Sequence, residues 1–174
     1  KRSFHRQRLI VFTRFRKPGT TKTRLIPALG PEGAASLQRR MTHQTLQTAR
    51  AWQRAGPGRQ VEVRFTGATA ADMANEFGFD LTYLPQGEGD LGQRLERAFD
   101  AVLNGTWGVD TAAAIGTDCP DLDKAVLDNA FATLQQHDVV LGPADDGGYY
   151  LIGMHDPIRN LFQDIEWGSN RVFD

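Results

Sequence analysis

Short apolar runs and helix-like stretches alternate along the chain. Residues 9–13 form a largely apolar run flanked by charged residues, a pattern typical of a buried strand. Residues 112–115 form a second run, and the helix pattern that follows favours a strand buried in a parallel sheet. Four more strands are predicted where apolar residues cluster or alternate with polar ones, at residues 61–65, 81–84, 139–141 and 149–152. The run at residues 139–141 is expected to be buried.

Apolar side chains at helical spacing separate these strands. The longest such stretch opens at Pro31 and ends near Gly56, with an imperfect stripe made of Ala34, Leu37, Met41, Ala49 and Trp52. Residues 70–77 predict a short helix ended by Gly78. Asp90 and Gln93 have the spacing of a capping box and open a helix with the core stripe Leu91, Leu95, Ala98, Phe99 and Val102.

One more helix completes the pattern. Asp121 or Asp123 suits its N-cap, and its inward residues are Val126, Leu127, Ala130, Phe131 and Leu134. Strands that alternate with helices imply right-handed crossovers. We therefore expect a single α/β domain over residues 1–174, with three α/β/α layers and a mostly parallel sheet.

Composition narrows the class of protein. Hydrophobic residues make up 40% of the chain and charged residues 24%, as in soluble globular proteins. No apolar stretch approaches the ~18 residues of a membrane span, and a single cysteine, Cys119, fits a reducing compartment. We expect a cytoplasmic protein without a membrane span. Because the chain lacks an initiating Met and stops in mid-pattern at Asp174, we also expect its C-terminal end to be incomplete.

The charges are unevenly distributed, although the net charge is only −1. Residues 1–24 contain nine Lys or Arg and no acidic residue, whereas residues 110–174 contain twelve acidic and three basic residues. Nucleic acid would suit the basic end but not the acidic half. A metal–phosphate ligand uses both signs, because cations bind phosphate oxygens and carboxylates bind Mg²⁺ or Mn²⁺.

Asp118 is the candidate metal ligand. It follows the buried run at residues 112–115, and Pro120 prevents that run from continuing as a central strand. The carboxyl ends of strands in open α/β sheets face the ligand crevice. The pattern predicts that Asp118 holds a divalent cation against a nucleotide diphosphate. Helix capping alone would leave Asp118 unexplained, and Cys119 is better explained as a packed thiol than as a nucleophile.

A basic loop follows the first strand. Residues 14–24 carry Pro18 and Gly19 and several cations, but Thr21 stands where a Walker loop requires glycine before the lysine. So many like charges repel one another without a counterion, which favours anion binding over a solvated loop. The candidate phosphate ligands are Arg14, Gly19, Lys22 and Arg24.

Residues 87–92 match the dinucleotide motif G-x-G-x-x-G. Glu88 and Asp90 would face the pyrophosphate, and at ~4 Å and an effective dielectric of ~20 each such contact costs about 4 kcal/mol. We therefore prefer a helix cap at Asp90 that also accepts hydrogen bonds from a ribose or base, with Arg94 available one turn later.

A second acidic segment, after the one that contains Asp118, lies at residues 142–150 between two predicted strands. Its Asp-Gly sequence suits a simple turn, but Gly147 and Gly148 also permit close approach of a ligand. We predict that Asp145 or Asp146, which the sequence does not separate, completes a metal site or orients an acceptor hydroxyl.

Taken together, these motifs make the chain resemble a bacterial family of nucleotide-diphospho-sugar transferases with the glycosyltransferase-A fold. Many members of this family have no assigned substrate. The resemblance runs from about Leu9 to Phe173. It is carried by residues 12–14, 18–19, 22–25, 89–94, 115–120, 142–153 and 167–168. The family continues beyond the end of this chain, into a segment expected to supply a last strand and an acidic motif.

The resemblance implies a nucleotide sugar or nucleotide at the basic loop, a metal carboxylate at Asp118, and a small-molecule acceptor beside residues 145–148. Glycosyl transfer with Mg²⁺ or Mn²⁺ is the function it favours. Nucleotidyl transfer from a nucleoside triphosphate to a sugar phosphate or similar acid is the first alternative, and a non-catalytic nucleotide-binding module is the second. No nucleic-acid partner is expected.

Overall fold

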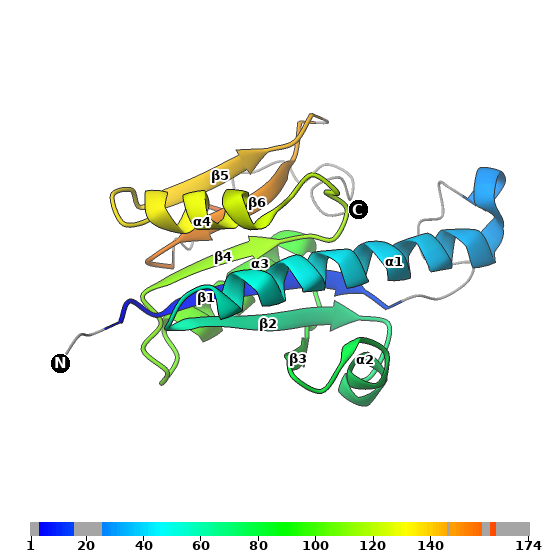
Figure 1. The fold of residues 1–174 in the computed structure, drawn as a ribbon, viewed down its shortest axis with the longest axis horizontal. Coiled ribbons are helices and arrows are strands. Elements are labelled where there is room, and N and C mark those ends of the chain that lie inside the picture. Colours follow the sequence, from blue (N-terminus) through cyan, green and yellow to red (C-terminus); the bar gives the residue numbers. More distant parts are fainter. Residues whose placement is uncertain (1–3, 16–25, 146, 158–160, 163–174) are drawn as a thin grey trace.

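Six strands form one sheet in the order β3-β2-β1-β4-β6-β5 (Figure 1). The computed structural model describes residues 4–15, 26–145, 147–157 and 161–162. The strands are β1 (Gln7–Arg14), β2 (Arg59–Thr66), β3 (Thr82–Pro85), β4 (Thr111–Ile115), β5 (Val139–Pro143) and β6 (Tyr149–Met154). Strand β1 runs parallel to β2 and β4, and β2 runs parallel to β3. Strand β6 is antiparallel to both β4 and β5, so the mostly parallel sheet ends in a hairpin.

Helices cover both faces of the sheet. They are α1 (Ile26–Arg54), α2 (Ala70–Phe77), α3 (Leu91–Leu103) and α4 (Lys124–Thr133). The buried residues of α1, α2 and α4 share one hydrophobic cluster, and those of α3 belong to a second cluster on the opposite face. Figure 1 shows α1 in front of the sheet and α3 behind it. The three-layer α/β/α architecture is confirmed.

Two covered faces explain why the central strands are apolar without alternation. Leu9 and Val11 enter the α1-side cluster, while Ile10 and Phe12 enter the α3-side cluster. All four side chains are at most 3% exposed. The whole of β4 is buried as well. Central strands that pack helices on both sides are held chiefly by apolar burial.

Helix ends follow local sequence signals. Thr69 and Asp90 cap α2 and α3 in complete capping boxes, and Asp123 rather than Asp121 caps α4. Gly30 has φ 72° and ψ 165°, so the regular part of α1 begins at Pro31, as predicted, although the element starts at Ile26. In the described part of the chain, no helix combines the length and the apolar character needed to cross a membrane.

Two details of the prediction were wrong. Strand β5 is an edge strand and only partly buried, with Leu141 39% exposed, because β6 inserts between it and β4. In α1, Leu37 and Met41 are half-buried and do not lie in the core. The side of α1 that faces the sheet near its N-terminal half instead carries buried polar residues, namely Gln38, Thr42 and Thr45.

Tyr83 on β3 gives a testable pH dependence. Its hydroxyl donates a hydrogen bond to the carbonyl oxygen of Gly78 at 2.7 Å, and burial raises the pKa of Tyr83 from 10.0 to about 12. Between these values the unfolded chain loses the phenolic proton while the folded chain keeps it. The stabilisation is therefore complete below pH 10 and is lost as the pH rises toward 12.

We expect Tyr83→Phe to be less stable than the wild type by about 1 kcal/mol at pH 8, through loss of this hydrogen bond. The gap should narrow as the pH rises through 10 to 11, because phenylalanine does not titrate. Urea unfolding of both proteins at pH 8, 10 and 11 measures this difference in the free energy of unfolding. A gap that stays constant across this range would contradict the expectation.

Candidate active site at the carboxyl edge of the sheet

Strands β1 and β4 meet at the point where the strand order reverses. From β1 the chain builds β2 and β3 on one side, and after α3 it returns to place β4 on the other side of β1. In open α/β sheets, ligands bind in the crevice outside the carboxyl ends of the strands at such a point. Val11 and Ile115 are register partners, and Arg14 and Asp118 each lie three residues further along. The fold thus places a predicted phosphate ligand and the predicted metal ligand at the carboxyl edge of two adjacent strands.

A buried polar network lies beneath this crevice. The hydroxyl oxygens of Thr13 and Thr42 are 3.0 Å apart. Gln38 Nε2 donates to Thr42 Oγ1 at 3.2 Å and to Thr117 Oγ1 at 3.0 Å. All four residues are at most 5% exposed. Since Thr13 precedes Arg14 and Thr117 precedes Asp118, the network links the two chain segments that carry the candidate charges.

Gln86 attaches the segment after β3 to the same edge. Its Nε2 donates to the carbonyl oxygen of Thr13 at 3.2 Å and to that of Arg64 at 3.1 Å. Arg94, on the first turn of α3, donates from Nη1 to Gln86 Oε1 at 3.4 Å. Through Gln86, Arg94 is therefore connected to the end of β1.

Asp90 acts first as a helix cap. Its Oδ1 accepts from the backbone N–H of Gln93 at 2.8 Å, and Gln93 Oε1 accepts from the backbone N–H of Asp90 at 2.9 Å. Gly87 and Gly89 have φ values of 82° and 99°. A Cβ at these positions would lie 2.4 Å from Arg97 Nη1 and 2.3 Å from Gln93 Oε1. Gly87 and Gly89 are thus explained by the positive φ of the loop and by its packing against α3.

The acidic segment at residues 142–150 lies at the same edge of the sheet, in the turn between β5 and β6. Asp145 is exposed in the β5–β6 turn, which is closed by a hydrogen bond from Ala144 N–H to the carbonyl oxygen of Gly148 at 2.8 Å. Asp146 lies outside the described residues, as do Gly19, Lys22 and Arg24 of the basic loop. Their proposed roles stay predictions.

The side chains at this edge fit a metal ion that takes part of its coordination from the phosphates of a bound nucleotide. Mg²⁺ is commonly bound by one or two carboxylates together with substrate phosphates and water. Asp118 is partly exposed and could supply one such carboxylate. Within the described ranges, no three His, Cys, Asp or Glu side chains are close enough to hold a metal ion between them. A metal ion beside Asp118 could take further oxygen ligands from bound phosphate groups and water. The neighbouring Cys119 packs against the core as a free thiol.

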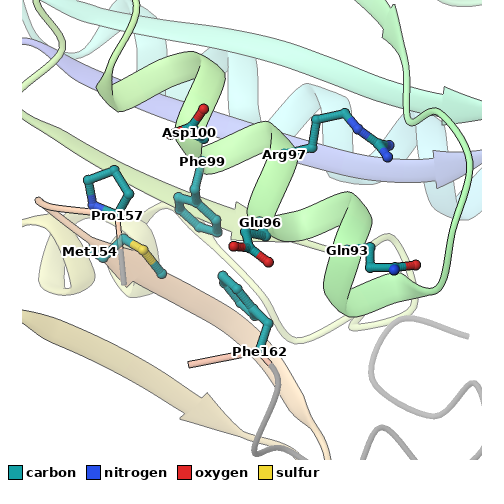
Figure 2. A pocket seen from close by; sticks show the side chains of 8 residues that line it. All are labelled: Gln93, Glu96, Arg97, Phe99, Asp100, Met154, Pro157 and Phe162. Carbon is teal, nitrogen blue, oxygen red and sulfur yellow. The ribbon is translucent and has the colours of Figure 1, made fainter. Parts of the chain in front are cut away.

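A separate pocket of about 370 Å³ lies between α3 and the end of β6. Figure 2 shows Phe99 and Phe162 facing each other across it, with ring centroids 5.9 Å apart, and Glu96 beside them. Arg97 also lines the pocket, but its guanidinium already donates to the main-chain carbonyls of Gln86 and Glu88 at 2.8 and 2.9 Å. With this guanidinium engaged, the pocket is a poor match for a phosphate ligand, and the carboxyl edge remains the candidate site.

Sequence reasoning missed the residues that connect the site. Gln38 and Thr42 interrupt the apolar stripe of α1 at helical spacing, and this interruption was a usable signal. Gln86 gave none, because its partners are backbone carbonyls on strands distant in sequence.

The comparisons with known proteins concern the family and the fold. Residues 45–169 match the family described as "uncharacterized protein conserved in bacteria (DUF2064)". The chain belongs to this family. No curated protein matches the chain.

Solved structures show the same fold. The "putative nucleotide-diphospho-sugar transferase" of Desulfovibrio desulfuricans G20 is 29% identical, with a TM-score of 0.82 over 96% of this chain and 71% of that one. A cytidylyltransferase of Leptospira borgpetersenii serovar Hardjo-bovis (strain JB197) is 14% identical, with a TM-score of 0.50 over 87% of this chain and 61% of that one. The second likeness concerns the fold alone.

Proposed function

We propose that the protein is a metal-dependent transferase that uses a nucleotide-activated sugar as donor. The observation that carries this proposal is the parallel pairing of β1 with β4 at the point where the strand order reverses, the switch point, since Arg14 and Asp118 follow the last paired residues of these strands. The similarity of nearly the whole chain to the Desulfovibrio protein supports the choice of donor. The switch point alone would suit many nucleotide ligands.

Each side of the crevice has a distinct task in this proposal. Arg14, with Lys22 and Arg24, neutralises the leaving nucleoside diphosphate as the bond between the anomeric carbon and the phosphate oxygen breaks. A Mg²⁺ or Mn²⁺ ion bound beside Asp118 would supply further positive charge there. Asp90 and Arg94 face the ribose or base.

The acceptor enters from the side of the β5–β6 turn. Its hydroxyl oxygen forms the new bond to the anomeric carbon, and Asp145 or Asp146 accepts the hydroxyl proton if the reaction inverts the configuration. Exposure of Asp145 at the edge of the sheet is compatible with this role.

Nucleotidyl transfer is the second candidate, because the many cations of residues 14–24 suit a triphosphate equally well. Product analysis separates the two reactions. Release of a nucleoside diphosphate indicates glycosyl transfer, and release of pyrophosphate indicates nucleotidyl transfer. Binding without turnover of any donor would indicate a non-catalytic module.

A thermal-shift panel tests the ligand class. We expect nucleotide sugars or nucleoside phosphates to raise the melting temperature more with Mn²⁺ than without it. A ligand at 100 times its Kd adds about 2.7 kcal/mol of stability, which is an easily measured shift. Failure of every nucleoside diphosphate, triphosphate and nucleotide sugar to shift the transition would overturn the proposal.

A further inference from the structure

We infer that Gln38 is a positioning residue that fixes the ends of β1 and β4 relative to each other and so sets the metal dependence of nucleotide binding. The inference rests on the proposed function. It arises from the network of Gln38, Thr42, Thr13 and Thr117 beneath the crevice.

The hydrogen-bond directions in this network follow from the number of donors. The hydroxyl of Thr42 donates its single hydrogen to the main-chain oxygen of Gln38 at 3.0 Å. Thr42 Oγ1 therefore acts as an acceptor toward both Thr13 and the side chain of Gln38. The side-chain amide of Gln38 donates one N–H to Thr42 and the other to Thr117. Both N–H bonds of the Gln38 amide thus have an acceptor, and together they connect α1 to Thr117 and, through Thr42, to Thr13.

The network is placed where a rigid spacing matters. Thr13 and Thr117 immediately precede Arg14 and Asp118, and both lie on the side of the sheet that α1 covers. The main-chain ladder pairs β1 with β4 only as far as Val11 and Ile115. Beyond this point, α1 supplies cross-links through Gln38. Since Gln38 is 5% exposed, it acts through Thr13 and Thr117 and does not reach the ligand itself.

The alternative is that Gln38 only satisfies buried polar groups. Such a role predicts lower stability on substitution but no change in how a metal assists nucleotide binding. A positioning role predicts a change in the ratio of the nucleotide Kd without metal to the nucleotide Kd with metal. Both Kd values are measured on folded protein, so a loss of stability alone does not change this ratio. Small displacements of binding groups have large effects on such ratios.

The experiment compares Gln38→Leu with the wild type, using Mn²⁺ and the nucleotide identified in the thermal-shift panel. Leucine has a similar volume but donates no hydrogen bond. We expect the ratio of the two Kd values to fall about tenfold, which corresponds to about 1.4 kcal/mol. Hydrogen exchange in peptides that cover residues 10–15 and 115–119 should become about tenfold faster at the same time.

Thr42→Val and Thr45→Val form a matched pair. Both threonines are buried on α1, at 0% and 7% exposure, and valine has the same shape. Only Thr42 belongs to the network. We expect Thr42→Val to lower the Kd ratio and raise exchange as Gln38→Leu does, and Thr45→Val to leave both unchanged.

The outcomes separate the two proposals. Metal-dependent binding in the wild type with an unchanged ratio in Gln38→Leu would overturn the positioning role and leave the proposed function intact. An equal effect in Thr45→Val would also overturn it, as general destabilisation. If the wild type binds no nucleotide, the proposed function fails and the positioning role fails with it, whatever the exchange data show.

Discussion

Asp118→Asn is expected to abolish the metal-dependent part of nucleotide binding while leaving metal-free binding intact. Loss of a direct metal ligand should weaken binding with Mn²⁺ by at least about a hundredfold, because outer-shell partners alone contribute 10–100-fold. Without metal, the variant loses a negative charge that repels phosphate, so its affinity should equal or exceed that of the wild type. Isothermal titration of both proteins, with and without Mn²⁺, measures all four constants.

Asp121→Asn provides the matched control, because Asp121 is an exposed carboxylate in the same segment and does not cap α4. It should bind like the wild type under both conditions. If the two variants behave alike, Asp118 has no special relation to the metal. Equal affinities of Asp118→Asn and the wild type under both conditions would instead favour a nucleotide-binding module without a metal site.

Local signals in the sequence were sufficient to predict the cap of α3 and the central strands, and they narrowed the cap of α4 to Asp121 or Asp123. Asp90, Gln93 and Asp123 act on backbone groups within three residues, so their roles depend on little beyond the neighbouring chain. The double-sided burial of β1 and β4 is equally visible, since apolar residues fill consecutive positions. The order of strands across the sheet is not a local property. For this reason the edge position of β5 was missed.

Part of the candidate site was predictable for the same reason. Asp118 was singled out because a buried strand ends just before it, and the parallel pairing of β1 with β4 puts it at the same edge of the sheet as Arg14. Its role stays a prediction. The contacts that connect the site were not predictable. Gln86 meets two carbonyls from strands that are far apart in sequence, and only the folded sheet brings them together.

Glu62→Ala is expected to destabilise the protein by about 3–5 kcal/mol, the usual effect of removing one partner from a buried ion pair. Glu62 is 1% exposed. Its Oε1 accepts from Arg8 Nη1 at 3.0 Å, and its Oε2 accepts from Arg64 Nε at 2.6 Å. Alanine would leave two largely buried guanidinium groups without a counter-charge. Since whole domains are stable by only about 5–15 kcal/mol, urea unfolding should show a large shift of the midpoint.

An exposed ion pair of the same length provides a control that tests whether burial causes this effect. Lys124 Nζ lies 2.6 Å from an Asp128 oxygen, as close as the Arg64–Glu62 contact, but the Lys124 side chain is 44% exposed. Exposed pairs contribute at most about 1 kcal/mol, so Lys124→Ala should change stability by less than that. Replacing Arg8, Glu62 and Arg64 together by Met, Leu and Met should recover much of the loss, because apolar residues of similar volume often match a buried ion network. Similar costs for Glu62→Ala and Lys124→Ala would mean that water reaches the guanidinium groups once the carboxylate is gone.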